Sequence, residues 1–107
     1  MGTMVKLSGN TKMCDEASDV LKAIAHPLRL RIVALLCERS EHVNGLAERL
    51  QVPQSIVSQQ LRILRMRGLV ASSRENGLSV YRLAEPNLKK VVSCMEICLS
   101  KRGGSQR

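Results

Sequence analysis

The chain has almost no aromatic side chains: its 107 residues include one Tyr and neither Phe nor Trp. A core without aromatics must rely on Leu, Ile, Val, Met and Ala, which favours packed helices over a large β-sandwich or barrel. Stacking of bases on aromatic rings, the usual basis of single-stranded RNA recognition, is largely unavailable. The length fits one domain. A chain this short buries only about two-thirds of its unfolded surface, so a homodimer is an expected source of stability.

Several other patterns are missing. No apolar run approaches the ~20 residues of a membrane-spanning helix, and the first residues lack a signal-peptide core, so we expect a cytoplasmic protein without a membrane partner. There is no Gly-rich phosphate loop, no pair of carboxylates in a plausible pocket and no Ser-His-Asp set, so we expect no enzyme. The four cysteines form no Cys-x-x-Cys pair, so a zinc finger is not indicated and free thiols are expected.

Positive charge is concentrated in one part of the chain. Lys and Arg outnumber Asp and Glu by 17 to 9, which gives a net charge of +8. Residues 53–82 carry five Arg and one acid, together with Ser and Gln side chains that can hydrogen-bond phosphates and base edges. A solvated basic face would show the same charge excess, but the mixture of Arg, Gln and Ser favours a nucleic-acid-binding surface.

Apolar residues recur at helical spacing along most of the chain. The pattern predicts a flexible arm at 1–11, one domain over 12–100 and a basic tail at 101–107. Within the domain we expect helices over about 12–25, 27–39, a short segment capped by Asn44, 53–67 and 86–100. Gly68 stands where a residue ending the fourth helix belongs.

The third and fourth predicted helices are joined by the tight turn Gln51-Val52, the spacing of a helix-turn-helix. Asn76-Gly77 lies between two short runs rich in Val, Ser and Tyr, which predicts a β-hairpin with strands 70–74 and 79–83, the wing of a winged helix. The predicted fold class is therefore mainly α with a two-stranded β wing. Residues 53–67 would enter the major groove of DNA. The expected DNA contacts are Gln54, Ser55, Ser58, Gln59, Gln60 and Arg62 on this helix, and Arg74 and Arg82 on the wing.

Three strings in this order, LKAIAHPLRLRIVALL, NGLAERLQVPQSIVSQQLRILRMRGLV and VYRL, resemble the ArsR/SmtB family of bacterial winged-helix repressors over about residues 16–100. The resemblance implies a homodimer through the first and last of five helices, which binds double-stranded operator DNA until an effector releases it. Two-fold symmetry implies half-sites about one helical turn apart. One departure is Gln60, where the family usually has His, although Gln can still donate to a phosphate.

The cysteines are the candidate effector site. Neither recurrent metal site of the family fits, because the segment SEHVNGLAERL has no Cys and the last helix has no His or Asp. Cys94 and Cys98 are one helical turn apart, with Cβ atoms ~5–6 Å apart. Cys14 lies in the first helix, which the resemblance places beside the last. Three thiolates there would suit arsenite, copper(I) or cadmium(II), and thiols also suit oxidation by reactive sulfur or other oxidants.

Cys37 is a further candidate, because some family members sense sulfur with one Cys in the second helix and one in the last. It stands one helical turn later than expected for those sensors. Core packing is the alternative for all four cysteines, since free Cys is commonly buried. Cys98 in particular shares an apolar stripe with Leu88, Val91 and Met95.

Two further expectations concern the rest of the chain. His42 lies in a polar segment and is expected to be a solvated surface residue. A winged helix used for protein or RNA assembly, with no operator, is the alternative function, and weak, sequence-blind binding to the protein's own promoter would favour it.

Overall fold

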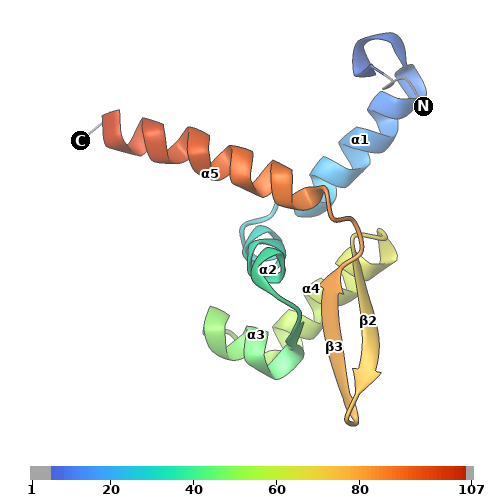
Figure 1. The fold of residues 1–107 in the computed structure, drawn as a ribbon. Coiled ribbons are helices and arrows are strands. Elements are labelled where there is room, and N and C mark those ends of the chain that lie inside the picture. Colours follow the sequence, from blue (N-terminus) through green and yellow to red (C-terminus); the bar gives the residue numbers. More distant parts are fainter. Residues whose placement is uncertain (1–5, 106–107) are drawn as a thin grey trace.

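The computed structural model describes the backbone of residues 6–105 and the side chains of residues 6–101 (Figure 1). After a 3-10 turn at Leu7–Gly9, its elements are α1 (Thr11–Ile24), α2 (Pro27–Glu38), β1 (Glu41–His42), α3 (Val43–Leu50), α4 (Gln54–Met66), β2 (Val70–Glu75), β3 (Leu78–Leu83) and α5 (Leu88–Ser105). This is a mainly helical, winged helix-turn-helix fold, as the sequence predicts. No helix in the described part of the chain is both long and apolar enough to cross a membrane.

The core lies where α2, α3 and α4 meet. Six side chains there are less than 2% exposed: Ile32, Val33, Leu46, Val57, Leu61 and Leu64. They come from one face of each helix, which is the amphipathic spacing that the sequence displays. This aliphatic core holds α4 against α2 and α3, which we call the body of the molecule. The opposite face of α4 is left free.

The wing contains three strands rather than the predicted two, in the order β1-β3-β2. The hairpin of β2 and β3 is confirmed, and its turn uses positive φ angles of 53° at Asn76 and 79° at Gly77, as a tight two-residue hairpin requires. The additional strand, β1, pairs His42 with Val80 of β3. A two-residue strand leaves no alternation in the sequence by which it could be recognised.

The helix ends that the sequence predicts from residues suited to positive φ are found in the structure, whereas the predicted start of α3 is not. Gly68 adopts φ +74° just after α4, and Gln51 adopts φ 59° at the turn between α3 and α4. The prediction that Asn44 caps α3 is wrong, because α3 begins at Val43 directly after β1, with His42 at the N-cap position and no side-chain cap. Pairing of His42 in the sheet places the start of the helix one residue earlier.

Regular secondary structure extends into both the expected arm and the expected tail. The 3-10 turn at Leu7–Gly9 precedes α1 inside the expected arm, and Asn10 caps α1 by accepting a hydrogen bond from the backbone of Met13 at 2.8 Å. α5 begins at Leu88 rather than residue 86, after a turn in which the Asn87 backbone donates to Glu85 Oε2, and it continues into the expected tail as far as Ser105. The remainder of the predicted arm and tail, residues 1–5 and 106–107, lies outside the described residues.

α1 and α5 project from the body in different directions (Figure 1). Only their inner ends contribute to the core, through Ala23 and Ile24 of α1 and Leu88 and Val92 of α5. The molecule therefore has a body that carries the wing and two helical arms at the opposite end.

Candidate nucleic-acid interface

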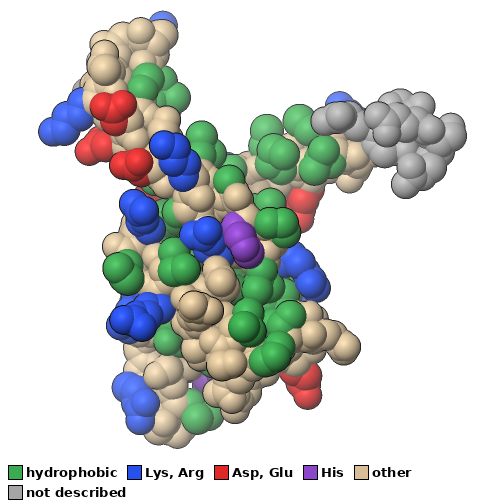
Figure 2. All heavy atoms as spheres, turned by 180° about the vertical axis from the view of Figure 1, so that it is seen from behind, with side chains coloured by type: hydrophobic (Ala, Val, Ile, Leu, Met, Phe, Trp, Pro, Cys, Tyr) green, Lys and Arg blue, Asp and Glu red, His purple; other side chains and the backbone are tan. Residues whose placement is uncertain are grey.

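The two faces of α4 differ sharply in polarity. Val57, Leu61 and Leu64 are fully buried against the body. Of the six predicted contact residues on this helix, five are exposed: Gln54, Ser55, Ser58, Gln59 and Arg62. Lys and Arg side chains lie along the side of the body that carries α4 and the wing (Figure 2). In the structure, therefore, the polar face of α4 lies on the outside of the molecule, with cationic side chains around it.

Gln60 is the exception on α4. Its side chain is partly buried, and its Oε1 atom is buried with no hydrogen-bond partner among the side chains and backbone that the structure describes. A side chain turned toward the body is poorly placed to reach a phosphate beside the outer face of the helix. The expectation that Gln60 joins the contact surface is therefore not supported by its position.

The predicted wing arginines occupy two different places. Arg74 pairs with Ser79 near the tip of the hairpin, and it lines a hollow together with Gln54 of α4. Arg82 pairs with Ala71 nearer the base, where it lines a separate hollow with Arg39 and Lys89. Both arginines are exposed on the strands of the wing, but only Arg74 is grouped with the start of α4.

A side-chain contact that sequence reasoning missed links α4 to the wing. Arg65 Nη1 donates a hydrogen bond of 3.2 Å to Ser72 Oγ on β2. Arg65 belongs to the same Arg-rich segment as Arg62, but its side chain is directed at the wing. It can reach Ser72 because the chain reverses at Gly68 and brings β2 beside α4. No pattern in the sequence indicates that contact.

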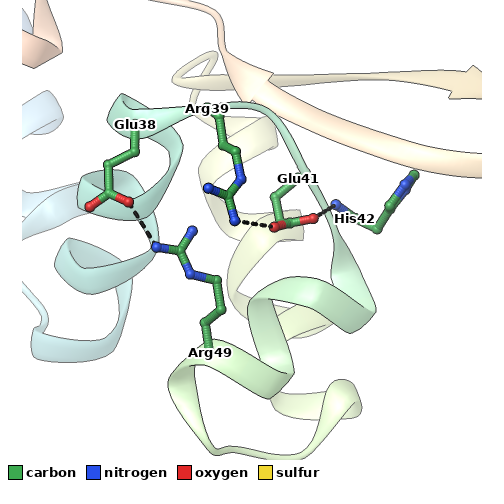
Figure 3. A network of polar contacts seen from close by, with 5 residues as sticks. All are labelled: Glu38, Arg39, Glu41, His42 and Arg49. Carbon is green, nitrogen blue, oxygen red and sulfur yellow. Dashed lines mark hydrogen bonds and ion pairs between the residues drawn. The ribbon is translucent and has the colours of Figure 1, made fainter.

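A polar network joins α3 to the elements that precede it (Figure 3). Arg49 of α3 donates to Glu38 at the end of α2 over 2.7 Å, and Arg39 lies 3.6 Å from Glu41. Glu41 Oε1 also accepts the backbone N–H of His42 at 3.0 Å. These contacts connect the end of α2, β1 and the last turn of α3, which is the first helix of the helix-turn-helix.

Gly45 makes room for this network. A Cβ atom at this position would overlap the Glu41 carboxylate. The Glu41 carboxylate therefore lies against the first turn of α3, where a negative charge complements the helix dipole. His42, in turn, is half-buried beside β3 rather than the solvated surface residue expected from the sequence.

The four cysteines are free and do not converge within one chain. Cys14, Cys94 and Cys98 are exposed and Cys37 is half-buried. The residues described include no group of three or more His, Cys, Asp or Glu side chains that could hold a metal ion. The expected meeting of Cys14 with Cys94 and Cys98 is absent from a single chain, because α1 and α5 diverge (Figure 1). Core packing is also wrong for Cys98 within one chain, since its side chain is exposed.

The Cys37 environment differs from those of the other thiols. Burial raises the pKa of the Cys37 thiol, the Lys89 cation lowers it, and Glu96 and Glu38 raise it further. The net rise in pKa reduces the thiolate fraction at neutral pH, which makes Cys37 a weaker nucleophile or metal ligand than an unperturbed thiol.

A model of the family described as "Bacterial regulatory protein, arsR family" matches residues 26–72, from the start of α2 into the wing. The HTH-type transcriptional repressor SmtB of Mycobacterium tuberculosis is 40% identical over 81 residues, which are 76% of this chain and 60% of the relative. This chain therefore spans less than two thirds of that repressor's length. The biofilm growth-associated repressor of Agrobacterium fabrum is 33% identical over 91 residues, 85% of this chain and 78% of the relative.

The solved structure of HlyU from Vibrio cholerae has the same fold. It superposes with a TM-score of 0.77 at 31% identity, over 83% of this chain and 97% of HlyU. Fold, helix-turn-helix position and sequence identity agree along most of the chain: it belongs to the arsR family of bacterial regulatory proteins.

Proposed function

We propose that this chain is a homodimeric transcriptional repressor that binds double-stranded operator DNA through α4 and the wing. The observation that carries the proposal is the division of α4 into a fully buried apolar face and an exposed face of Gln, Ser and Arg. Two relatives, the SmtB and biofilm growth-associated repressors, are themselves named as repressors.

The exposed face of α4 has the chemistry of base and phosphate recognition. A major groove admits one α-helix, Arg62 can bond the O6 and N7 atoms of guanine, and Gln59 can bond the N6 and N7 atoms of adenine. Ser55 and Ser58 can bond either bases or phosphates. Arg74, near the wing tip, would add a contact outside the groove that α4 fills.

The arms supply the basis for a dimer. Apolar side chains are exposed on α5, including Met95 at 46%, Ile97 at 58% and Leu99 at 50%, and on α1, where Leu21 is 55% exposed. Figure 2 shows hydrophobic side chains gathered along the α5 arm. Pairing of these arms with those of a second copy would remove them from water and place two α4 helices about a two-fold axis.

Band shifts with the protein's own promoter test DNA binding. Arg62→Ala and Gln59→Ala are each expected to weaken binding by about 1–3 kcal/mol at one base position while leaving the thermal unfolding curve unchanged. Lys12→Ala, at the far end of α1, is the matched control for loss of an exposed positive charge. Unchanged affinity in both α4 variants would remove this helix from the groove.

We further propose that the effector acts on Cys94 and Cys98. Both thiols are exposed on α5, one helical turn apart, in the helix whose apolar residues would form the dimer. Thiolate binding of arsenite, copper(I) or cadmium(II), or oxidation of the thiols, would alter that surface and with it the spacing of the two α4 helices. A coupling free energy of roughly 1–3 kcal/mol between the two sites suffices for release.

An operator-release assay tests this effector site. Arsenite, cadmium, copper(I), persulfide and peroxide are added in parallel to the wild type and to a Cys94→Ser, Cys98→Ser variant. We expect the variant to bind DNA normally and to lose its response, whereas single Cys14→Ser and Cys37→Ser variants show whether these thiols contribute. Normal induction of the double variant would exclude the pair as the sensor.

A further inference from the structure

We propose that the hollow between α3, α4 and the wing is a binding site for one phosphate of the DNA backbone, with His42 and Asn44 as contacts in addition to Arg74. This inference rests on the proposed DNA binding and assigns to it two residues that are not among the DNA contacts expected from the sequence. We call this hollow the wing pocket; its lining residues are His42, Val43, Asn44, Gln54, Arg74, Gly77, Leu78, Ser79 and Tyr81.

The position of the wing pocket fits the DNA backbone. On one side is Gln54, the first residue of α4, which would enter the major groove. On the other is the wing, with Arg74 and the tip residue Gly77. A strand that passes between a helix in the major groove and a wing outside it must bring its phosphates past the space between them.

The charge of the wing pocket favours an anion. Its lining contains Arg, His, Asn and Gln side chains and no Asp or Glu. Both ion pairs found among residues 6–101 lie elsewhere, so Arg74 has no acidic partner in this part of the chain. Asn44 is exposed and forms no side-chain hydrogen bond within the described residues. A phosphate oxygen would satisfy both donors.

The orientation of the His42 ring ties phosphate binding to a proton. His42 Nδ1 lies 3.4 Å from the carbonyl oxygen of Ser79 on β3. A carbonyl oxygen only accepts, so this contact favours a hydrogen on Nδ1, and Nε2 of a neutral ring would then be an acceptor. An acceptor repels a phosphate, whereas the doubly protonated ring presents an Nε2–H donor and a positive charge. Phosphate binding therefore favours proton uptake by His42.

The groups around His42 leave this linkage intact. Arg74 of β2 and Tyr81 of β3 line the same pocket, and Asn44 and Gln54 face it from α3 and α4. The nearest acid, Glu41, accepts the His42 backbone N–H and lies 3.6 Å from Arg39, so it is already engaged. A bound phosphate would offset the positive charge that Arg74 places beside the ring.

Fluorescence anisotropy with an operator duplex tests the proposal. Between about pH 7.5 and about pH 6, we expect the affinity of the wild type to rise several-fold, and at most about tenfold per pH unit for each protomer, as one proton is taken up. His42→Gln should lose this rise. The chain has only two His, and His26→Gln, at the exposed turn between α1 and α2, is the matched control and should keep it.

The salt dependence of the same binding curve gives a second readout that does not depend on His42. Arg74→Ala should reduce the slope of log affinity against log salt by about one per protomer. Asn44→Ala should weaken binding at all salt concentrations with no change in slope, because it removes a neutral contact. Both substitutions are at exposed positions and are expected to leave the fold intact.

Two results would overturn the proposal while leaving DNA binding in place. These are an unchanged pH response in His42→Gln, or wild-type affinity in both Asn44→Ala and Arg74→Ala, when Arg62→Ala still weakens binding. Failure of the wild type to bind any promoter duplex specifically would instead overturn the proposed function, and the wing pocket with it.

Discussion

α4 and α5 both carry apolar residues among polar ones, yet the chain buries these apolar residues in α4 and leaves most of them exposed in α5. α4 buries Val57, Leu61 and Leu64 completely within the chain. α5 buries Leu88 and Val92 where it leaves the body, and beyond them Met95, Ile97 and Leu99 are all close to half exposed. The chain itself buries the apolar residues of α4, whereas most apolar residues of α5 stay exposed to solvent in the single chain.

This difference distinguishes the part of the molecule that the single chain packs by itself from the apolar surface that is available for a second copy. The body and α4 form a closed core, so the face of α4 that would read DNA is held rigidly by packing beneath it. The exposed apolar surface on α5 is of the kind that marks an interaction site. Changes to the two helices should therefore have different signatures, in unfolding for α4 and in association for α5.

The largest expected effect is on the stability of the body. Leu61→Ala should lower the free energy of unfolding by about 3 kcal/mol, within the range of about 2–5 kcal/mol for leucines of this kind, because it leaves a cavity among fully buried neighbours. Ile97→Ala is the control, since it removes an apolar side chain that is 58% exposed in the single chain. Urea unfolding at several protein concentrations measures both.

The Leu61 loss should be the same at every concentration, and any Ile97 loss should depend on concentration because association stabilises the dimer by mass action. Equal, concentration-independent losses in the two variants would remove the distinction between α4 and α5.

The second effect is on self-association. Ile97→Asp would place a charge among the exposed apolar residues of α5 that we assign to the dimer, and the dimer dissociation constant should rise by about 100-fold or more, which is about 2.7 kcal/mol. Leu78→Asp, at the 51% exposed wing-tip position, is the control for adding a charge to an exposed apolar site. Sedimentation at micromolar concentration measures both. A monomeric wild type would contradict the dimer itself.

Much of the fold and the exposed face of α4 could be predicted from the sequence, because they depend on the spacing of apolar residues and on residues that favour turns. The helix-turn-helix, the hairpin at Asn76-Gly77 and the end of α4 at Gly68 each follow from spacing or from a residue suited to positive φ. The outward face of α4 follows from the same periodicity that places Leu61 inside.

The errors lie where a residue's position depends on a distant segment. β1 exists because Glu41 and His42 pair with β3, nearly forty residues later in the chain, and the same pairing moves the start of α3. Strand register also decides that Arg74 and Arg82 line different hollows, which no pattern in the sequence indicates. The positions of the cysteines could not be predicted because the directions in which α1 and α5 leave the body are not encoded in any local pattern (Figure 1).

The smallest expected effect is in thiol chemistry, and it separates the body from the arms once more. Cys37 is half-buried at the end of α2, and burial raises the pKa of its thiol, whereas Cys14 is exposed on α1. A raised pKa means less thiolate at neutral pH, so alkylation by iodoacetamide should be several-fold slower at Cys37 than at Cys14. It should accelerate as the pH rises from about 7 to about 9 and the thiol ionises.

Mass spectrometry of a digest made after brief alkylation gives the ratio of alkylated to unmodified thiol at Cys37 and Cys14. The same digest reports this ratio for Cys94 and Cys98. Slow alkylation of this exposed pair in the wild type, relieved in the Ile97→Asp monomer, would show that association covers them. Alkylation of Cys37 as fast as that of Cys14 at neutral pH would contradict the raised pKa. Because the thiolate is the form that binds metals and attacks oxidants, Cys37 would then be as available to an effector as the exposed thiol of Cys14.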